Sequence, residues 1–150
     1  MAERIGASIV AGLMAGIVFG MLMEGTSAPM IGMIGRILAG HPSMPVGWIF
    51  HLLYSAILGG LFGRIVGDRA HDLRAGLAWG AGYGIALWII GGLVLLPLLL
   101  GMPPFAPLVR ASLRTFAIVS LFGHLVFGIV MGVIVGAFSS IPDRGQRVTS

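Results

Sequence analysis

Long apolar runs dominate this chain, and their lengths predict helices that cross a membrane. A bilayer core of about 30 Å needs about 20 mostly apolar residues in each helix. Four runs meet this requirement: Ile5 to Met23, Gly47 to Val66, Ala75 to about Gly101, and about Thr115 to Phe138. Arg64 is the only charged residue inside them, one turn from the end of its run, where a long side chain can reach the headgroups. The pattern therefore predicts an all-α membrane protein with four spanning helices.

Small residues recur at every fourth position in each of these runs. Residues four apart share one face of a helix. Lipid provides no hydrophobic force between helices, so faces of small residues that let backbones approach closely supply the contact instead. We therefore expect a tight four-helix bundle, or two tight hairpins joined together. The predicted packing positions are Gly12, Gly16 and Gly20; Ser55, Gly59 and Gly63 after His51; Gly76, Gly80 and Gly84; and Gly128, Gly132 and Gly136 after His124.

The two halves of the chain resemble each other. Ala11 to Met21 and Ala75 to Ile85 both read Ala-Gly-Leu-x-x-Gly-x-x-aromatic-Gly, and His51 to Gly63 aligns with His124 to Gly136. The pattern predicts one membrane domain over residues 1–150, built by duplication of a two-helix unit, with halves at 5–66 and 74–138 and a tail at 139–150. Both units would have the same orientation in the membrane, and a pseudo-two-fold axis along the membrane normal would relate them.

Both connections on the outer side are rich in proline and apolar residues. From Pro29 to Gly40 the apolar positions have helical spacing, which predicts a short helix in the membrane interface. Pro97 is expected to end or kink the third helix near Leu96. We expect both outer connections to pack onto the spanning helices.

Composition and charge support this interpretation and add an orientation. Hydrophobic residues make up 57% of the chain and charged residues 9%, with mean hydropathy +1.03; an average soluble domain has about 25% charged residues. This excludes a soluble domain and a nucleic-acid-binding protein. Six of the nine arginines lie on the side that holds both termini, which predicts a multi-pass protein of the cytoplasmic (inner) membrane with both termini in the cytoplasm. A cleavable signal peptide is an alternative for the N-terminus, but the first run exceeds the usual apolar length of about 7–15 residues.

Two histidines are the strongest candidates for chemistry. His51 and His124 each begin a ridge of small residues, so both are expected to face protein at similar depth. A polar side chain there needs a partner. The alternatives are a hydrogen bond to a neighbouring helix, ligation of haem b by both rings, a transition-metal site, and a proton or substrate relay. Glu24 is either a solvated helix end or a carboxylate partner for His51, Arg36 or a cation.

A weaker metal hypothesis concerns copper. Several methionines and His41 fall at the outer end of the chain, and thioethers with imidazole suit Cu(I). Methionine also fills gaps in apolar packing without any metal. His51, His124, Glu24 and His41 are therefore the predicted candidate ligands, and the cofactor is open between haem, copper and none.

The sequence contains no motif that combines a nucleophile, a base and an orienting group. We therefore expect a non-catalytic binding or accessory protein in contact with lipid, associated with a larger membrane complex or with further copies of itself. One alternative is a redox or metal-binding module that uses the histidine pair. A second alternative is a small transporter or channel formed by oligomerisation.

The chain resembles a family of uncharacterised four-span integral membrane proteins of bacteria and archaea. The resemblance rests on the glycine-rich first run, the Pro-Met-Ile-Gly-Met-rich outer loop that begins at Pro29, and the segment Gly123-His124-Leu125-Val126-Phe127-Gly128. It implies a four-helix membrane fold and implies no particular activity.

Overall fold

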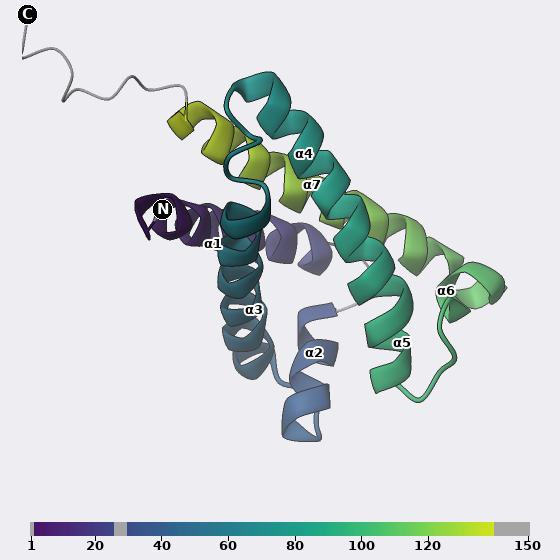
Figure 1. Ribbon diagram of the computed structural model, residues 1–150. Helices are drawn as coiled ribbons and strands as arrows, with labels where there is room; N and C mark the ends of the chain where they lie inside the picture. Colours follow the sequence, from purple (N-terminus) through teal and green to yellow (C-terminus); the bar gives the residue numbers. More distant parts are fainter. Residues whose placement is uncertain (1, 26–29, 140–150) are drawn as a thin grey trace, which may run out of the picture.

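The computed structural model describes residues 2–25 and 30–139, and this part of the chain contains helices and no strands (Figure 1). The predicted tail lies outside the described residues except for residue 139. In chain order the elements are α1 (Ala2–Glu24), α2 (Met30–Ala39), α3 (Met44–Ile65), α4 (Leu73–Leu87), the π-helix η1 (Trp88–Leu95), α5 (Leu96–Leu99), α6 (Ala106–Val109), the 3₁₀ turn η2 (Ala111–Leu113) and α7 (Arg114–Ser139).

Four of the helical segments are long and apolar enough to cross a membrane, as the hydrophobic pattern predicts. They are Arg4–Glu24, Met44–Ile65, Leu73–Leu99 and Ala111–Ser139. The third is composite, because α4, η1 and α5 follow one another without a break. The all-α fold class and the four spans are therefore confirmed.

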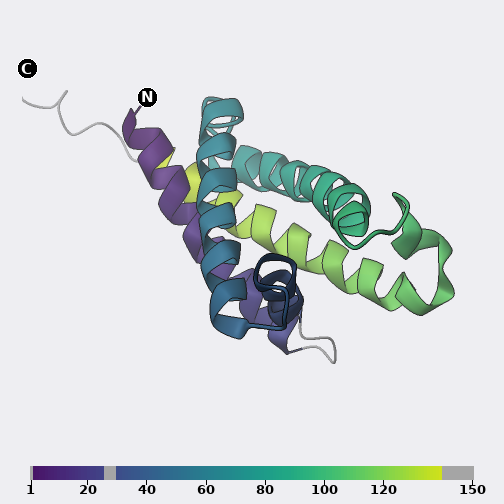
Figure 2. The same cartoon turned by 90° about the horizontal axis from the view of Figure 1, so that it is seen from below.

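The spans form two close pairs, α1 with α3 and α4 with α7 (Figures 1 and 2). We call α1, α2 and α3 the first hairpin, and α4 through α7 the second hairpin. In the first hairpin, a Cβ built on Gly12 would lie 2.8 Å from the Cα of Gly59, and one on Gly16 would lie 2.6 Å from the Cβ of Ser55. Real Cβ atoms do not approach this closely, so the contact requires small residues.

The second hairpin has the same kind of contact. A Cβ on Gly80 would lie 3.0 Å from the Cα of Gly132, and one on Gly128 would lie 2.8 Å from the backbone nitrogen of Gly84. At the end of the pair, a Cβ on Gly136 would lie 2.6 Å from the carbonyl oxygen of Asp72. The arrangement is therefore two tight hairpins joined together, which is one of the two arrangements that the glycine spacing predicts.

Aromatic side chains join the two hairpins. The Tyr83 hydroxyl of α4 donates a hydrogen bond to the Leu58 carbonyl of α3 at 2.9 Å, and its ring contacts Phe62 edge-on. On the other side α1 packs on α7, where the Phe19 ring fills the space that Gly123 leaves open. Backbones therefore meet within each hairpin, and side chains meet between the hairpins.

The third span changes its helical geometry before Pro97. Proline has no amide hydrogen, so it cannot bond the carbonyl of Leu93 four residues earlier. The Phe105 amide donates to that carbonyl instead, at 2.7 Å, and Phe105 adopts the left-handed conformation (φ 63°) there. Upstream, the Leu96 amide bonds the carbonyl of Gly91, five residues back. Pro97 thus does not end the helix near Leu96, because the span continues through α5 to Leu99.

The connections that follow α1 and α5 both pack on the spans, as expected. The predicted short helix is α2, and Gly47 in the first turn of α3 lies so close to the Ile31 carbonyl that no Cβ would fit. Glu24 accepts a hydrogen bond from the Ile31 amide at 3.2 Å, so it caps the start of α2. In the second hairpin α6 packs on α7 and η1.

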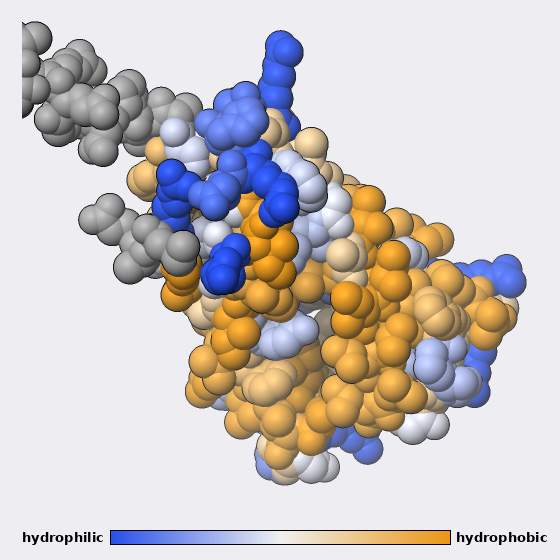
Figure 3. Space-filling model, in the orientation of Figure 1, coloured by the Kyte–Doolittle hydropathy of each residue, from blue (hydrophilic) through white to orange (hydrophobic). Residues whose placement is uncertain are grey.

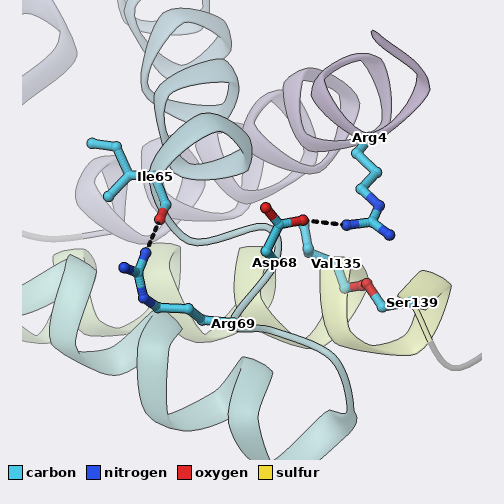
Figure 4. A network of polar contacts seen from close by, with 6 residues as sticks. All are labelled: Arg4, Ile65, Asp68, Arg69, Val135 and Ser139. Atoms are coloured by element: carbon cyan, nitrogen blue, oxygen red, sulfur yellow. Dashed lines mark hydrogen bonds and ion pairs between the residues drawn. The ribbon is translucent and has the colours of Figure 1, made fainter. Parts of the chain in front are cut away.

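Charged groups gather where α3 ends and α4 begins (Figure 3). Arg4 donates to Asp68, and the Arg69 guanidinium donates to the Ile65 carbonyl (Figure 4). Asp72 caps α4 by accepting from the Ala75 amide at 2.8 Å, and this hydrogen bond holds the pKa of its carboxyl below the ordinary value. Apolar residues cover most of the face between this end and the other (Figure 3).

Candidate functional site

A cavity of about 370 Å³ lies between the two hairpins. Its volume falls within the range of about 300–1,000 Å³ that is typical of small-molecule sites. Figure 3 shows the hollow on the face between α3 and the third span. Helices α1, α2, α3 and α7 and the segments η1 and α5 all contribute to its walls, together with the last residue of α4.

The walls are apolar with few exceptions. The polar lining side chains are His51, Tyr54, Ser55, Ser120 and His124. The apolar ones include Met30 and several isoleucines from α2, Phe50 and Leu58 from α3, and leucines from η1 and α5. Both predicted histidines therefore line the same cavity.

His51 connects α3 to α1. Its Nε2 lies 2.9 Å from the carbonyl oxygen of Gly16. A carbonyl oxygen can only accept, so Nε2 carries the hydrogen and Nδ1 of the neutral ring is left as an acceptor. The Gly16 carbonyl is within reach because Gly16 and Ser55 let the two backbones approach closely. The predicted hydrogen bond to a neighbouring helix is present at this histidine.

His124 uses its other ring nitrogen, and it bonds its own helix. Its Nδ1 lies 2.7 Å from the Ser120 carbonyl oxygen one turn earlier. By the same reasoning Nδ1 donates, and Nε2 of the neutral ring is an acceptor. Among the described residues this Nε2 has no hydrogen-bond partner, and it faces Gly91 of η1, where a Cβ would still be 3.9 Å away. The two histidines thus present different nitrogens.

Phe19 touches both histidine rings. Its ring centroid lies 5.7 Å from that of His51 and 4.9 Å from that of His124, both edge-on. Trp48 packs on the other side of Gly20 and also contacts His51 edge-on, at 5.9 Å. The histidines therefore belong to an aromatic cluster in the inner wall of the cavity.

The other predicted ligands lie apart from this pair. Glu24 caps α2, and His41 is exposed, with its Nδ1 3.3 Å from the Pro42 carbonyl oxygen. Within residues 2–25 and 30–139, no three histidine or carboxylate side chains come together as a metal site. Among histidine and carboxylate side chains of the described residues, an ion or haem in this cavity would have only His51 and His124 as ligands, and it would have to fit beside Phe19.

The sequence pattern does not reveal the part of the wall that η1 forms. Gly91 and Gly92 face α7 there, and a Cβ on Gly92 would lie 3.2 Å from the Ser120 Oγ and 3.7 Å from the His124 ring. π-Helical segments are rare and occur often at functional sites. The signal was the Gly91-Gly92 pair one and a half turns before Pro97, in which Gly92 continues the four-residue spacing of the third span beyond Trp88.

This arrangement is suited to binding. Ser55, the serine nearest to His51 in sequence, donates its hydroxyl to the His51 backbone carbonyl at 2.7 Å rather than to a ring nitrogen. No nucleophile–base pair is therefore formed at Ser55. The Ser120 hydroxyl lies 3.4 Å from His124 Nδ1, but this nitrogen carries a hydrogen that it donates to the Ser120 carbonyl, so it cannot take the hydroxyl proton. The cavity offers a large apolar surface and a few hydrogen-bonding atoms, which is the usual composition of a small-molecule site.

No protein-family model, curated protein or solved structure matches this chain.

Proposed function

We propose that this chain is a non-catalytic membrane protein that binds a small apolar molecule in the cavity between its hairpins. The observation that carries the proposal is the cavity itself, which has a volume of about 370 Å³ and is lined mostly by apolar side chains of α2 and of all four apolar spans. An empty apolar space of this size lacks packing contacts that an apolar ligand would restore.

The direct test is to isolate the protein with its surrounding lipid in polymer discs and to identify co-purifying small molecules by native mass spectrometry. Gly91→Leu fills the cavity, because its Cβ has ordinary room and the longer side chain would extend into the space beside His124. Gly82→Leu is the matched control on the same span, since nothing lies within 4 Å of a Cβ there.

We expect wild type and Gly82→Leu to retain a bound apolar molecule and to bind a fluorescent long-chain probe, and Gly91→Leu to do neither. Equal retention by Gly91→Leu and wild type would overturn the proposal. So would a wild-type protein that carries no molecule and takes up no probe.

The redox alternative keeps one supporting observation, which is that His51 and His124 line the same cavity and contact the same phenylalanine. A visible absorption spectrum and metal analysis of protein produced with added haem and copper test it. Absence of a Soret band and of bound copper would refute it.

We further propose that the two hairpins are duplicated units. The aligned positions make matching contacts: Gly12 packs on Gly59 as Gly76 packs on Gly132. The aligned pair Phe19 and Tyr83 each reach across to the second long helix of the other hairpin. A homologue with a single hairpin that assembles as a dimer would support duplication.

From the arginines we propose that both termini lie in the cytoplasm. We also propose that the protein lies in the cytoplasmic membrane. The charged end formed by Arg4, Arg64, Asp68, Arg69 and Arg74 supports it. Single cysteines placed at His71 and at His41, labelled from one side with an impermeant reagent, test it. Labelling of the His71 position from outside the cell would reverse the orientation.

Association with a larger complex or with a second copy stays a proposal, to be tested by the mass of the particle in native discs.

A further inference from the structure

The chemistry of the ligand follows from which atoms in the cavity wall lack partners. Both histidines donate their one N–H to backbone carbonyls, at 2.9 Å for His51 and 2.7 Å for His124. The nitrogens that remain, Nδ1 of His51 and Nε2 of His124, can only accept. Among the described residues neither has a donor. An acceptor without a partner is costly where no water competes, so each of these atoms favours a ligand that donates.

His124 is the better placed of the two for a ligand. Its Nε2 faces Gly91, and the absence of a side chain there leaves room against the ring. The neighbouring Ser120 hydroxyl lies 3.2 Å from the position that a Cβ of Gly92 would take, so it borders the same surface. Ser120 can donate or accept, and therefore does not discriminate. At this position His124 Nε2, unlike the Ser120 hydroxyl, selects a donor over an acceptor.

The route to this position opens toward lipid. The hollow is open on the face between α3 and the third span (Figure 3), and its lining residues Phe50, Tyr54, Leu95 and Leu99 are all exposed, Leu99 by 66%. Exposed apolar side chains on membrane spans face acyl chains. A ligand dissolved in the bilayer can therefore enter sideways between α3 and the η1–α5 segment, with its apolar part in contact with the α2 isoleucines.

We propose that the cavity selects a long-chain apolar molecule bearing a hydroxyl group, with the hydroxyl donating to Nε2 of His124 and accepting from the Ser120 hydroxyl. This rests on the proposed function and deepens it. A ketone of the same skeleton could accept from Ser120 and would leave His124 Nε2 without a donor. The site thus discriminates between two molecules that differ by two hydrogen atoms.

The test uses a long-chain secondary alcohol and the ketone with the same carbon skeleton, each competing with a fluorescent long-chain probe for the protein in lipid discs. We expect the alcohol to displace the probe at about tenfold lower concentration than the ketone, as one matched hydrogen bond in a dry site allows. In His124→Phe, which keeps a ring of similar shape against Phe19, the alcohol should fall to the level of the ketone while the ketone is unchanged.

His41→Phe is the matched control, because it makes the same change at an exposed histidine outside the cavity lining, and it should retain the tenfold ratio. A ketone that binds as tightly as the alcohol in wild type refutes the selectivity, while displacement of the probe by either still supports the cavity as a binding site. Failure of both compounds and of the probe itself would refute the proposed function. If His124→Phe does not fold, the ratio in wild type still decides.

Discussion

The contact between α4 and α7 can be tested with two glycines that lie two residues apart. Gly80 faces α7, and a Cβ there would be 3.0 Å from the Cα of Gly132 and from the carbonyl carbon of Gly128. Gly82 faces away, with nothing within 4 Å. Replacing each by alanine adds one methyl group to the same helix. The gain in helix propensity, up to about 1 kcal/mol, is common to both variants. The difference between them therefore isolates the clash.

The size of that clash follows from the distances. Comfortable carbon–carbon contacts are about 3.5–4.0 Å, so the helices must separate by at least about 0.5–1 Å at Gly80, where the Gly128 carbonyl oxygen lies closer still. A gap of that size loses about a quarter to a half of the dispersion energy of the neighbouring contacts. Overpacking of this kind typically costs about 1–3 kcal/mol. We expect Gly80→Ala to have a free energy of unfolding lower than that of Gly82→Ala by about this amount.

The assay is reversible unfolding in mixed micelles, followed by tryptophan fluorescence, for both variants and for Gly128→Ala. Gly128 packs against Gly80, so the double variant should lose less than the sum of the two single losses, because the helices have already separated. Equal stabilities for Gly80→Ala and Gly82→Ala would refute the conclusion that backbone proximity holds this hairpin together.

Three further predictions address other contacts. A backbone hydrogen bond holds the pKa of Asp72 below its ordinary value. The ionised carboxylate therefore stabilises the fold above the ordinary pKa, and this stabilisation is lost as the pH falls through the lowered pKa. Thermal unfolding midpoints measured between about pH 2 and 6 should therefore fall less with decreasing pH in Asp72→Asn than in wild type. Tyr83→Phe removes the hydroxyl that joins the hairpins and should lower the free energy of unfolding by about 0.6 kcal/mol in the same micelle titration, and an unchanged value would count against that contact. Pro97→Ala supplies an amide that competes for the Leu93 carbonyl, so the Phe105 amide should exchange with deuterium faster than in wild type, and an unchanged rate would contradict this account of the bond.

The spans and their packing faces could be predicted because both are properties of single helices. Apolar length indicates a span, and spacing of four indicates which face is small; Gly12, Gly59, Gly80 and Gly132 lie where that reasoning places them. The choice between one bundle and two joined hairpins could not be made, because each ridge of small residues fits any of the others.

The cavity and the roles of its residues could not be predicted from the sequence, for a different reason. A cavity is the volume between hairpins, and the apolar pattern does not determine how far apart they lie. The carbonyl of Leu93 in the π-helix accepts its hydrogen bond from the distant residue Phe105, which no local pattern reveals. The tautomers of His51 and His124 depend on which backbone oxygen each ring reaches. Each histidine stands at the same spacing before its ridge of small residues, whereas their hydrogen-bond partners differ.

The two kinds of contact also differ in how freely they can vary over evolution. Where the glycine ridges meet inside each hairpin, an added Cβ collides with backbone or with a closely packed side chain of the facing helix, so substitutions there are constrained to the smallest residues. Along the seam between hairpins the contacts are made by large side chains around an open space, where a change of size or polarity alters the shape of the cavity and leaves the hairpins intact. A lineage could therefore change the shape and polarity of this cavity while the scaffold of the two hairpins stays the same.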